Sequence, residues 1–179
     1  MRNALKQLEN VANQVMLGKN AIYANVKKKI ILPEKGLSCS AFHEMGHAIN
    51  ANISKFGKIL QGSRQFALFA IPIALIALIK NKKAEGEKPK NKLDSIGDFV
   101  KNNAGKLVFA SYIPLLLEEG LASIKGGKLA KQVLSPDLAK KVSKTNAIGF
   151  CTYLTVAALS SIGLALGTKI RDKIVEKSK

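Results

Sequence analysis

Three apolar stretches, separated by polar and basic pieces, form the main pattern of this chain. The longest, residues 147–167, has 21 residues without a charge. As a helix rising 1.5 Å per residue it would be about 30 Å long, the thickness of the hydrocarbon layer of a bilayer. Residues 66–79 and 107–117 are shorter and contain Pro72 and Pro114. The pattern predicts an all-α, membrane-embedded helical bundle with a C-terminal transmembrane helix and a short membrane hairpin.

The two shorter stretches approach spanning length only when they are extended back to Gln65 and to Asn102, with the Lys106 ammonium group placed among the lipid headgroups. Proline in a membrane helix predicts a kink, because neighbouring helices or water satisfy the freed carbonyl group. Apolar stretches of about 10 to 14 residues also suit the core helices of a soluble bundle. We therefore expect between one and three spans.

Basic residues fill the pieces between the apolar stretches. Residues 80–105 carry seven Lys and four acidic residues and predict a solvated linker or hairpin tip. Residues 124–145 carry six Lys among spaced apolar residues, which favours an interfacial region on anionic lipid headgroups. The predicted organisation is one domain with an N-terminal amphipathic region (1–37), a central core with the hairpin (38–123), this basic interfacial region, and a transmembrane helix with a basic tail (146–179).

The N-terminal region has no continuous apolar core and no small-residue cleavage site, so it does not resemble a secretory signal. Its apolar residues recur at helical spacing and predict the packing face of an amphipathic helix. They are Leu5, Leu8, Ala12, Val15 and Met16.

Composition supports a membrane protein and argues against two other classes. Of the 179 residues 47% are apolar, which argues against a disordered chain, although the formal charge is +17. The basic runs contain almost no aromatic residues to stack on bases, so we expect no nucleic-acid partner. Anionic membrane lipids are the expected partners, and the expected location is integral to a membrane.

The longest apolar stretch contains Gly163 and Gly167, four residues apart. This spacing lets two helix backbones approach closely in lipid. It predicts helix–helix association through these two glycines.

Residues 43–47 form the pattern His-Glu-x-x-His. On a helix, residues i and i+4 share a face, so the imidazoles of His43 and His47 can bind one Zn²⁺. The metal lowers the pKa of bound water toward about 7, and Glu44 would take its proton as general base. The motif predicts hydrolysis of a peptide bond by metal-activated water.

A catalytic zinc needs a third protein ligand, and no further His exists in the chain. Glu118 and Glu119 directly follow an apolar run, where charge is costly unless it is used. Ser123 lies at i+4 from Glu119, where it can hydrogen-bond a ligating His. This register favours Glu119, and Glu118 is the alternative.

The order of these parts resembles the gluzincin membrane proteases, the group containing the CAAX prenyl endopeptidases and the bacterial heat-shock membrane protease. The resemblance rests on the motif at residues 43–47, a membrane hairpin, and Glu119 followed by Ser123, where that family usually has Asp. It implies a zinc metalloendopeptidase with His43, His47 and Glu119 as ligands. The substrate would be a peptide or a membrane protein.

Two alternatives stay open. Site-2-type intramembrane proteases share the His-Glu-x-Gly-His pattern but take an Asp ligand from a Leu-Asp-Gly turn, for which Leu93-Asp94-Ser95 is the nearest match. A non-catalytic basic membrane scaffold or lipid-binding protein, with an inert motif, is the competing class.

Overall fold

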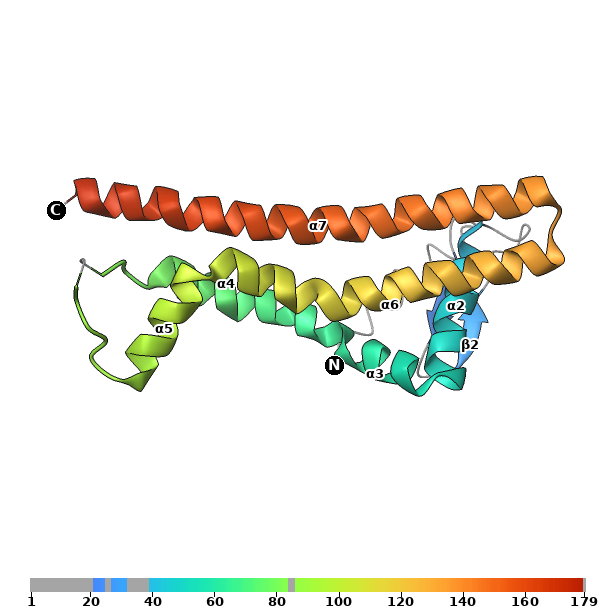
Figure 1. The fold of residues 1–179 in the computed structure, drawn as a ribbon, viewed down its shortest axis with the longest axis horizontal. Coiled ribbons are helices and arrows are strands. Elements are labelled where there is room, and N and C mark those ends of the chain that lie inside the picture. Colours follow the sequence, from blue (N-terminus) through green and yellow to red (C-terminus); the bar gives the residue numbers. More distant parts are fainter. Residues whose placement is uncertain (1–20, 25–26, 32–38, 84–85, 179) are drawn as a thin grey trace. The chain divides into compact units, whose positions relative to one another are not determined.

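The structure, a computed structural model, describes residues 21–24, 27–31, 39–83 and 86–178 (Figure 1). The predicted amphipathic helix around Leu5 lies outside these residues. The elements in chain order are β1 (Ile22–Ala24), β2 (Lys29–Ile31), α2 (Cys39–Ile53), α3 (Lys55–Ser63), the 3-10 helix η1 (Arg64–Phe69), α4 (Ala70–Ile79), α5 (Lys92–Asn102), α6 (Ala104–Val133) and α7 (Pro136–Lys177). The mostly helical architecture that the sequence predicts is confirmed.

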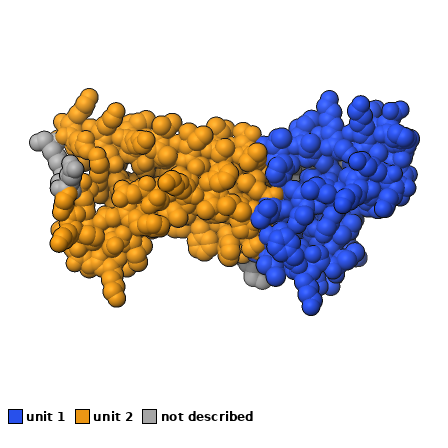
Figure 2. Space-filling model, in the orientation of Figure 1, with its two compact units in different colours: residues 1–62, 117–151 blue, residues 63–116, 152–179 orange. Residues whose placement is uncertain are grey.

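The chain divides into two compact units, each assembled from two separate segments (Figure 2). Unit 1 comprises residues 1–62 and 117–151, and unit 2 comprises residues 63–116 and 152–179. The long helices α6 and α7 each contribute residues to both units.

In unit 1, helices α2 and α6 approach so closely that only glycine fits between them. A Cβ atom at Gly46 would lie 2.0 Å from the carbonyl oxygen of Ala122, and one at Gly126 would lie 2.1 Å from that of Phe42. Beside these contacts is a small apolar core of Phe42, Ala130 and Val142. Because both glycines meet backbone and not flexible side chains, they set the distance between the two helices.

A short antiparallel hairpin of β1 and β2 belongs to unit 1, with Tyr23 opposite Ile30. The prediction of an all-α fold did not include it. Each strand has three residues, which is too few to show an alternating pattern in the sequence.

Helix α5 of unit 2 turns its charged side inward. Asp94 and Asp98 each form ion pairs with both Lys80 and Lys83, and these hydrogen bonds hold the pKa of Asp94 below its usual range. The outward side is apolar, with exposed Leu93, Ile96 and Phe99. The predicted solvated linker at residues 80–105 therefore contains a helix, because the charges that suggested solvation neutralise one another.

Buried polar contacts join the helices of unit 2. Lys101 is 7% exposed, and its Nζ donates hydrogen bonds to Asp172 Oδ1 at 2.8 Å and to the carbonyl oxygen of Ala77 at 3.3 Å. Ser161 Oγ donates to the carbonyl oxygen of Gly105 at 2.7 Å. These bonds connect α5 and α6 to α7.

Among the described residues, three helical stretches are long and apolar enough to cross a membrane: Lys55–Ile79, Ala104–Val133 and Pro136–Lys177. All three predicted apolar stretches are thus helical, and each lies within a longer helical stretch, of which the first is divided into α3, η1 and α4. The 3-10 helix η1 lies just before Pro72, which lacks the N–H that would bond to the Leu68 carbonyl in a regular α-helix.

The predicted basic region takes a different form in the structure, and the predicted association through two glycines is not tested by it. The basic region 124–145 is not one element, because its first residues end α6 and its last residues begin α7, on either side of a break at residues 134–135. Gly163 and Gly167 contact no other helix of the described chain, since a Cβ added at either would meet nothing within 4 Å. Association through these glycines stays a prediction.

Candidate metal centre

One face of helix α2 carries the polar side chains of the site. His43, His47 and Asn50 follow one another at intervals of four and three residues, so their side chains share a face. The same helix contains Gly46, which allows this face to approach α6. Local spacing thus aligns the imidazoles, and the glycine contact brings them to a partner helix.

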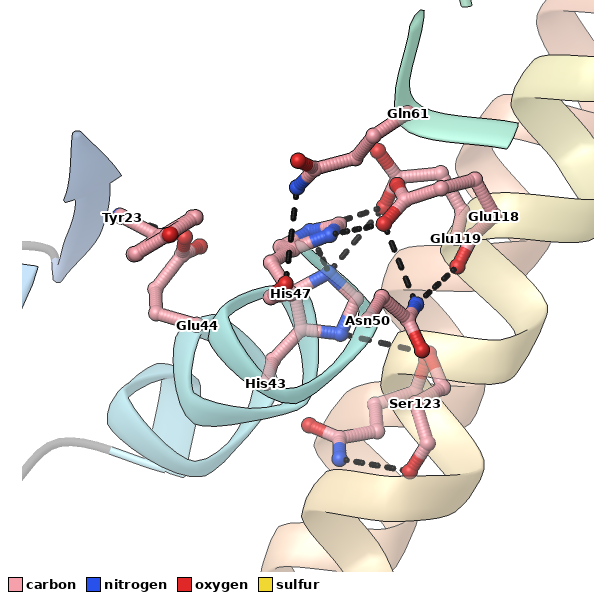
Figure 3. A network of polar contacts seen from close by, with 10 residues as sticks. Tyr23, His43, Glu44, His47, Asn50, Gln61, Glu118, Glu119 and Ser123 are labelled. Carbon is pink, nitrogen blue, oxygen red and sulfur yellow. Dashed lines mark hydrogen bonds and ion pairs between the residues drawn. The ribbon is translucent and has the colours of Figure 1, made fainter. Parts of the chain in front are cut away.

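The imidazoles converge on Glu119 of α6 (Figure 3). His43 Nε2 lies 3.0 Å from Glu119 Oε2 and 3.0 Å from His47 Nε2, and His47 Nε2 lies 3.6 Å from Glu119 Oε2. Glu119 is fully buried, and His47 is 5% exposed. Two imidazole nitrogens and a carboxylate oxygen therefore surround one point.

The opposite ring nitrogens are held by other partners. His47 Nδ1 lies 2.9 Å from Glu118 Oε1, and His43 Nδ1 lies 3.2 Å from Ser123 Oγ. An ionised carboxylate can only accept, and Ser123 Oγ directs its own proton to the carbonyl oxygen of Asn146 at 3.5 Å, so both contacts suit an imidazole that carries its proton on Nδ1. An imidazole with its proton on Nδ1 presents a lone pair at Nε2. Both histidines thus direct a metal-binding atom toward the point shared with Glu119.

This donor set fits a divalent metal ion. Three lone-pair atoms facing one another at such short range repel unless a cation or a proton lies between them. Ligands at zinc distances of about 2.0–2.2 Å in a tetrahedron are about 3.3 Å apart, and the three observed separations lie on either side of this value. Among the described residues, His43, His47 and Glu119 form a group with the composition and spacing of a metal site.

Two asparagines hold the residues around this group. Asn50 Nδ2 donates to Glu118 Oε1 at 3.1 Å, and Asn146 Nδ2 of α7 donates to the carbonyl oxygen of Ser123 at 3.2 Å. Asn50 is fully buried and Asn146 is 4% exposed. Each imidazole is therefore oriented by a partner that is itself hydrogen-bonded.

Glu44 points to a different neighbour. Its Oε2 accepts a hydrogen bond at 2.7 Å from the backbone N–H of Tyr23 in β1. In Figure 3 the Glu44 carboxylate lies beside Tyr23, across the imidazoles from Glu118 and Glu119. Tyr23 Oη in turn accepts from Asn52 Nδ2 at 2.9 Å, so the hairpin is attached to α2 at two points.

The pKa values of two groups on α2 are shifted upward. Burial raises the pKa of the Glu44 carboxyl, against the opposing effects of His47 and of the Tyr23 amide. Burial lowers the pKa of the His47 imidazole, but the hydrogen bond to Glu118 and the charges of Glu118 and Glu119 outweigh it, so the net shift is upward. Both groups thus favour their protonated forms more than they would in water.

The structure brings the candidate ligands His43, His47 and Glu119 together, and the predicted contact between Ser123 and a histidine of the motif is present. Glu118 has a role that the sequence did not indicate. Its carboxylate contacts Nδ1 of His47, the ring nitrogen that faces away from the candidate metal position. Asp94, the ligand of the site-2 alternative, instead binds Lys80 and Lys83.

Sequence reasoning missed Tyr23, Asn50 and Asn146. Of these, only Asn50 had a local signal, because it continues the face of His43 and His47 by helical spacing. Tyr23 and Asn146 come from elements whose packing on the site has no sequence pattern.

Comparisons with protein families, with curated proteins and with solved structures found no match to this chain. The arguments about its function therefore rest on its own residues.

Proposed function

We propose that this chain is a zinc-dependent integral-membrane endopeptidase that cleaves peptide bonds by metal-activated water. The observation that carries the proposal is the orientation of the two imidazoles: both Nδ1 atoms are held by outer partners, and both Nε2 atoms face Glu119 Oε2. Two His and one Glu are the ligand set of a well-known class of catalytic zinc sites, in which the fourth position is left for water or substrate.

The membrane part of the proposal rests on the three apolar helical stretches. In two of them, Lys55–Ile79 and Pro136–Lys177, only 6% of the most apolar 18-residue segment is buried within the described part of the chain. Apolar side chains facing outward along such lengths suit contact with lipid.

Six polar residues of the site have a role in the proposed reaction. His43, His47 and Glu119 would hold the ion, while Glu118 and Ser123 fix the imidazole orientation. A zinc ion supplies Lewis acidity, which polarises a carbonyl group and makes water a nucleophile near neutral pH. Glu44 would accept the proton of the attacking water and pass it to the leaving amine.

The test is a joint measurement of metal content and peptide cleavage on detergent-purified full-length protein. The wild type should contain about one zinc per chain. His47→Ala should lose both the metal and the activity. Glu44→Gln should retain zinc and lose cleavage of a mixture of fluorogenic peptides, because Glu44 is no ligand in the proposed site.

Three outcomes would contradict the proposal. Folded wild-type protein without metal would favour the scaffold alternative. Loss of zinc in Glu44→Gln would mean that the roles are misassigned. Full cleavage activity of the Glu44→Gln variant would exclude Glu44 as the general base. Glu176→Gln is the matched control, because Glu176 is exposed on α7 and pairs with Lys82, far along the chain from the motif.

A further inference from the structure

Unit 2 contains a basic pocket with a volume of about 410 Å³ between the start of α6 and the C-terminal part of α7. Four of its lining residues are the lysines Lys82, Lys101, Lys169 and Lys173. Two are acidic and already engaged: Asp172 accepts from Lys101 at 2.8 Å, and Glu176 pairs with Lys82 at 3.4 Å.

The remaining two lysines give the pocket its charge. Lys169 and Lys173 have no acidic partner within ion-pair distance among the described residues. They lie one helical turn apart on α7, so their ammonium groups can reach the same ligand. Lys101, 7% exposed, is fixed at the wall of the pocket. The pocket therefore offers a site for a group with negative charge.

An apolar groove of about 470 Å³ continues from this pocket along the same two helices. The groove and the pocket share Gly105 and Ala165. The groove is lined further by the apolar residues Phe109, Ile113 and Ile162, and Lys106 lines it next to the shared Gly105. The hydroxyl group of Ser161, which also lines it, is satisfied by the carbonyl oxygen of Gly105. The groove thus offers an apolar surface next to the basic pocket.

The basic pocket and the apolar groove follow one another as the charged headgroup and the apolar chain do in an amphiphile. Along α7 the basic pocket begins at Ala165 and extends to Glu176, whereas the groove extends back from Ala165 to Ser161 into the apolar stretch. A free phosphate ion would use only the pocket. A phospholipid would use both, with its phosphate among the lysines and an acyl chain in the groove.

We propose that unit 2 binds one molecule of an anionic glycerophospholipid at this site, with Lys169 and Lys173 contacting the headgroup phosphate. The proposal rests on the membrane part of the proposed function and is independent of the metal centre, whose residues all belong to unit 1.

The experiment is native mass spectrometry of the full-length protein, released from nanodiscs that contain equal amounts of phosphatidylglycerol and phosphatidylcholine with the same acyl chains. The wild type should retain one phosphatidylglycerol preferentially. The double variant Lys169→Gln/Lys173→Gln should reduce this preference about 25-fold, since each lysine near a lipid surface contributes about fivefold. Lys88→Gln/Lys90→Gln removes the same number of positive charges from exposed residues that line neither the pocket nor the groove, and should leave the preference unchanged.

Two further arms distinguish the source of the phosphate. Glycerol 3-phosphate and inorganic phosphate at millimolar concentration should not displace the lipid, because they cannot fill the groove. Ala110→Phe, which narrows the groove, should weaken retention of the lipid without changing the charge.

Several results would overturn the proposal. These are equal retention of both lipids by the wild type, equal loss in the two double variants, and displacement by inorganic phosphate, which would indicate a free-anion site. Zinc content is measured on the same samples, so failure of the metal centre and failure of the lipid site give separate readouts. A thermal unfolding midpoint equal to that of the wild type, measured by circular dichroism, shows that Lys169→Gln/Lys173→Gln is folded.

Discussion

Two neighbouring glutamates of α6 perform different tasks at the candidate metal centre. Consecutive residues of a helix point about 100° apart, so Glu118 and Glu119 cannot reach the same atom with equal geometry. Glu119 Oε2 faces the two Nε2 atoms, whereas Glu118 Oε1 binds Nδ1 of His47. Glu119 therefore lies where a ligand is needed, and Glu118 lies where it can orient a ligand.

This difference predicts a graded loss of zinc affinity in three variants. Glu119→Gln should lose the metal almost completely, because an anionic ligand is removed. Glu118→Gln should weaken zinc binding by about 10- to 100-fold, and Ser123→Ala by about 10-fold, as expected for partners of ligating histidines. Competition with a chromophoric chelator measures all three affinities.

The order of the effects is the decisive result. If Glu118→Gln lost more zinc than Glu119→Gln, the ligand would be Glu118, and the contacts of the two carboxylates would have to exchange on metal binding. Glu176→Gln, an exposed glutamate of unit 2, should have no effect.

At the scale of elements, the contact between α2 and α6 decides whether the ligands meet. Gly46 and Gly126 are the only residues of the described helices at which an added Cβ would lie within about 2 Å of the facing helix's backbone. Gly46 lies inside the motif itself, one residue before His47. The motif therefore specifies a helix–helix distance as well as a pair of metal ligands.

Substitution of Gly46 by Ala should separate the two helices. We expect a loss of about 3 kcal/mol in unfolding free energy, the upper end for overpacking against a rigid neighbour, together with weaker zinc binding. Thermal unfolding of the apo and zinc-loaded protein tests both effects.

The matched control is Gly62→Ala on α3, where an added Cβ meets nothing within 4 Å. This change should leave the protein as stable or slightly more stable, because alanine favours a helix. If Gly46→Ala behaved like Gly62→Ala, the close packing of α2 on α6 would be wrong.

At the scale of the whole molecule, the proposal that all three apolar helical stretches cross a membrane predicts which connections share a side of it. The segment between α4 and α6 and the C-terminal tail should face one side, and the connection at residues 134–135 the other. Contacts within unit 2 agree with a shared side for the α4–α6 segment and the C-terminal tail, because Arg171 near the end of α7 donates to the carbonyl oxygens of Ile79 and Lys80.

This topology is tested by labelling single cysteines in a background without Cys39 and Cys151. A membrane-impermeant maleimide applied to sealed vesicles should give Lys88→Cys and Ser178→Cys the same accessibility. Ser135→Cys should show the opposite accessibility to the maleimide. Equal labelling of all three in intact vesicles would exclude three crossings and would favour the soluble helical bundle that apolar stretches of this length also suit.

Local spacing alone determined much of this protein. The interval between His43 and His47 places both imidazoles on one helical face, and uncharged stretches of sufficient length predict apolar helices. The four-residue interval from Glu119 also places Ser123 on the same face of its helix, which made Ser123 the candidate partner of a ligating histidine. These features depend on the geometry of single helices, which the sequence states directly.

Other features were decided only by tertiary structure. The sequence could not show that Glu118 would bind His47, that Asn50 and Asn146 would hold the outer partners, or that the charges of α5 would face inward to Lys80 and Lys83. Helical periodicity defines the faces of each helix, but which faces meet depends on contacts between residues far apart in the chain. Here the packing of Gly46 and Gly126 places Glu119, 72 residues beyond His47, beside the imidazoles.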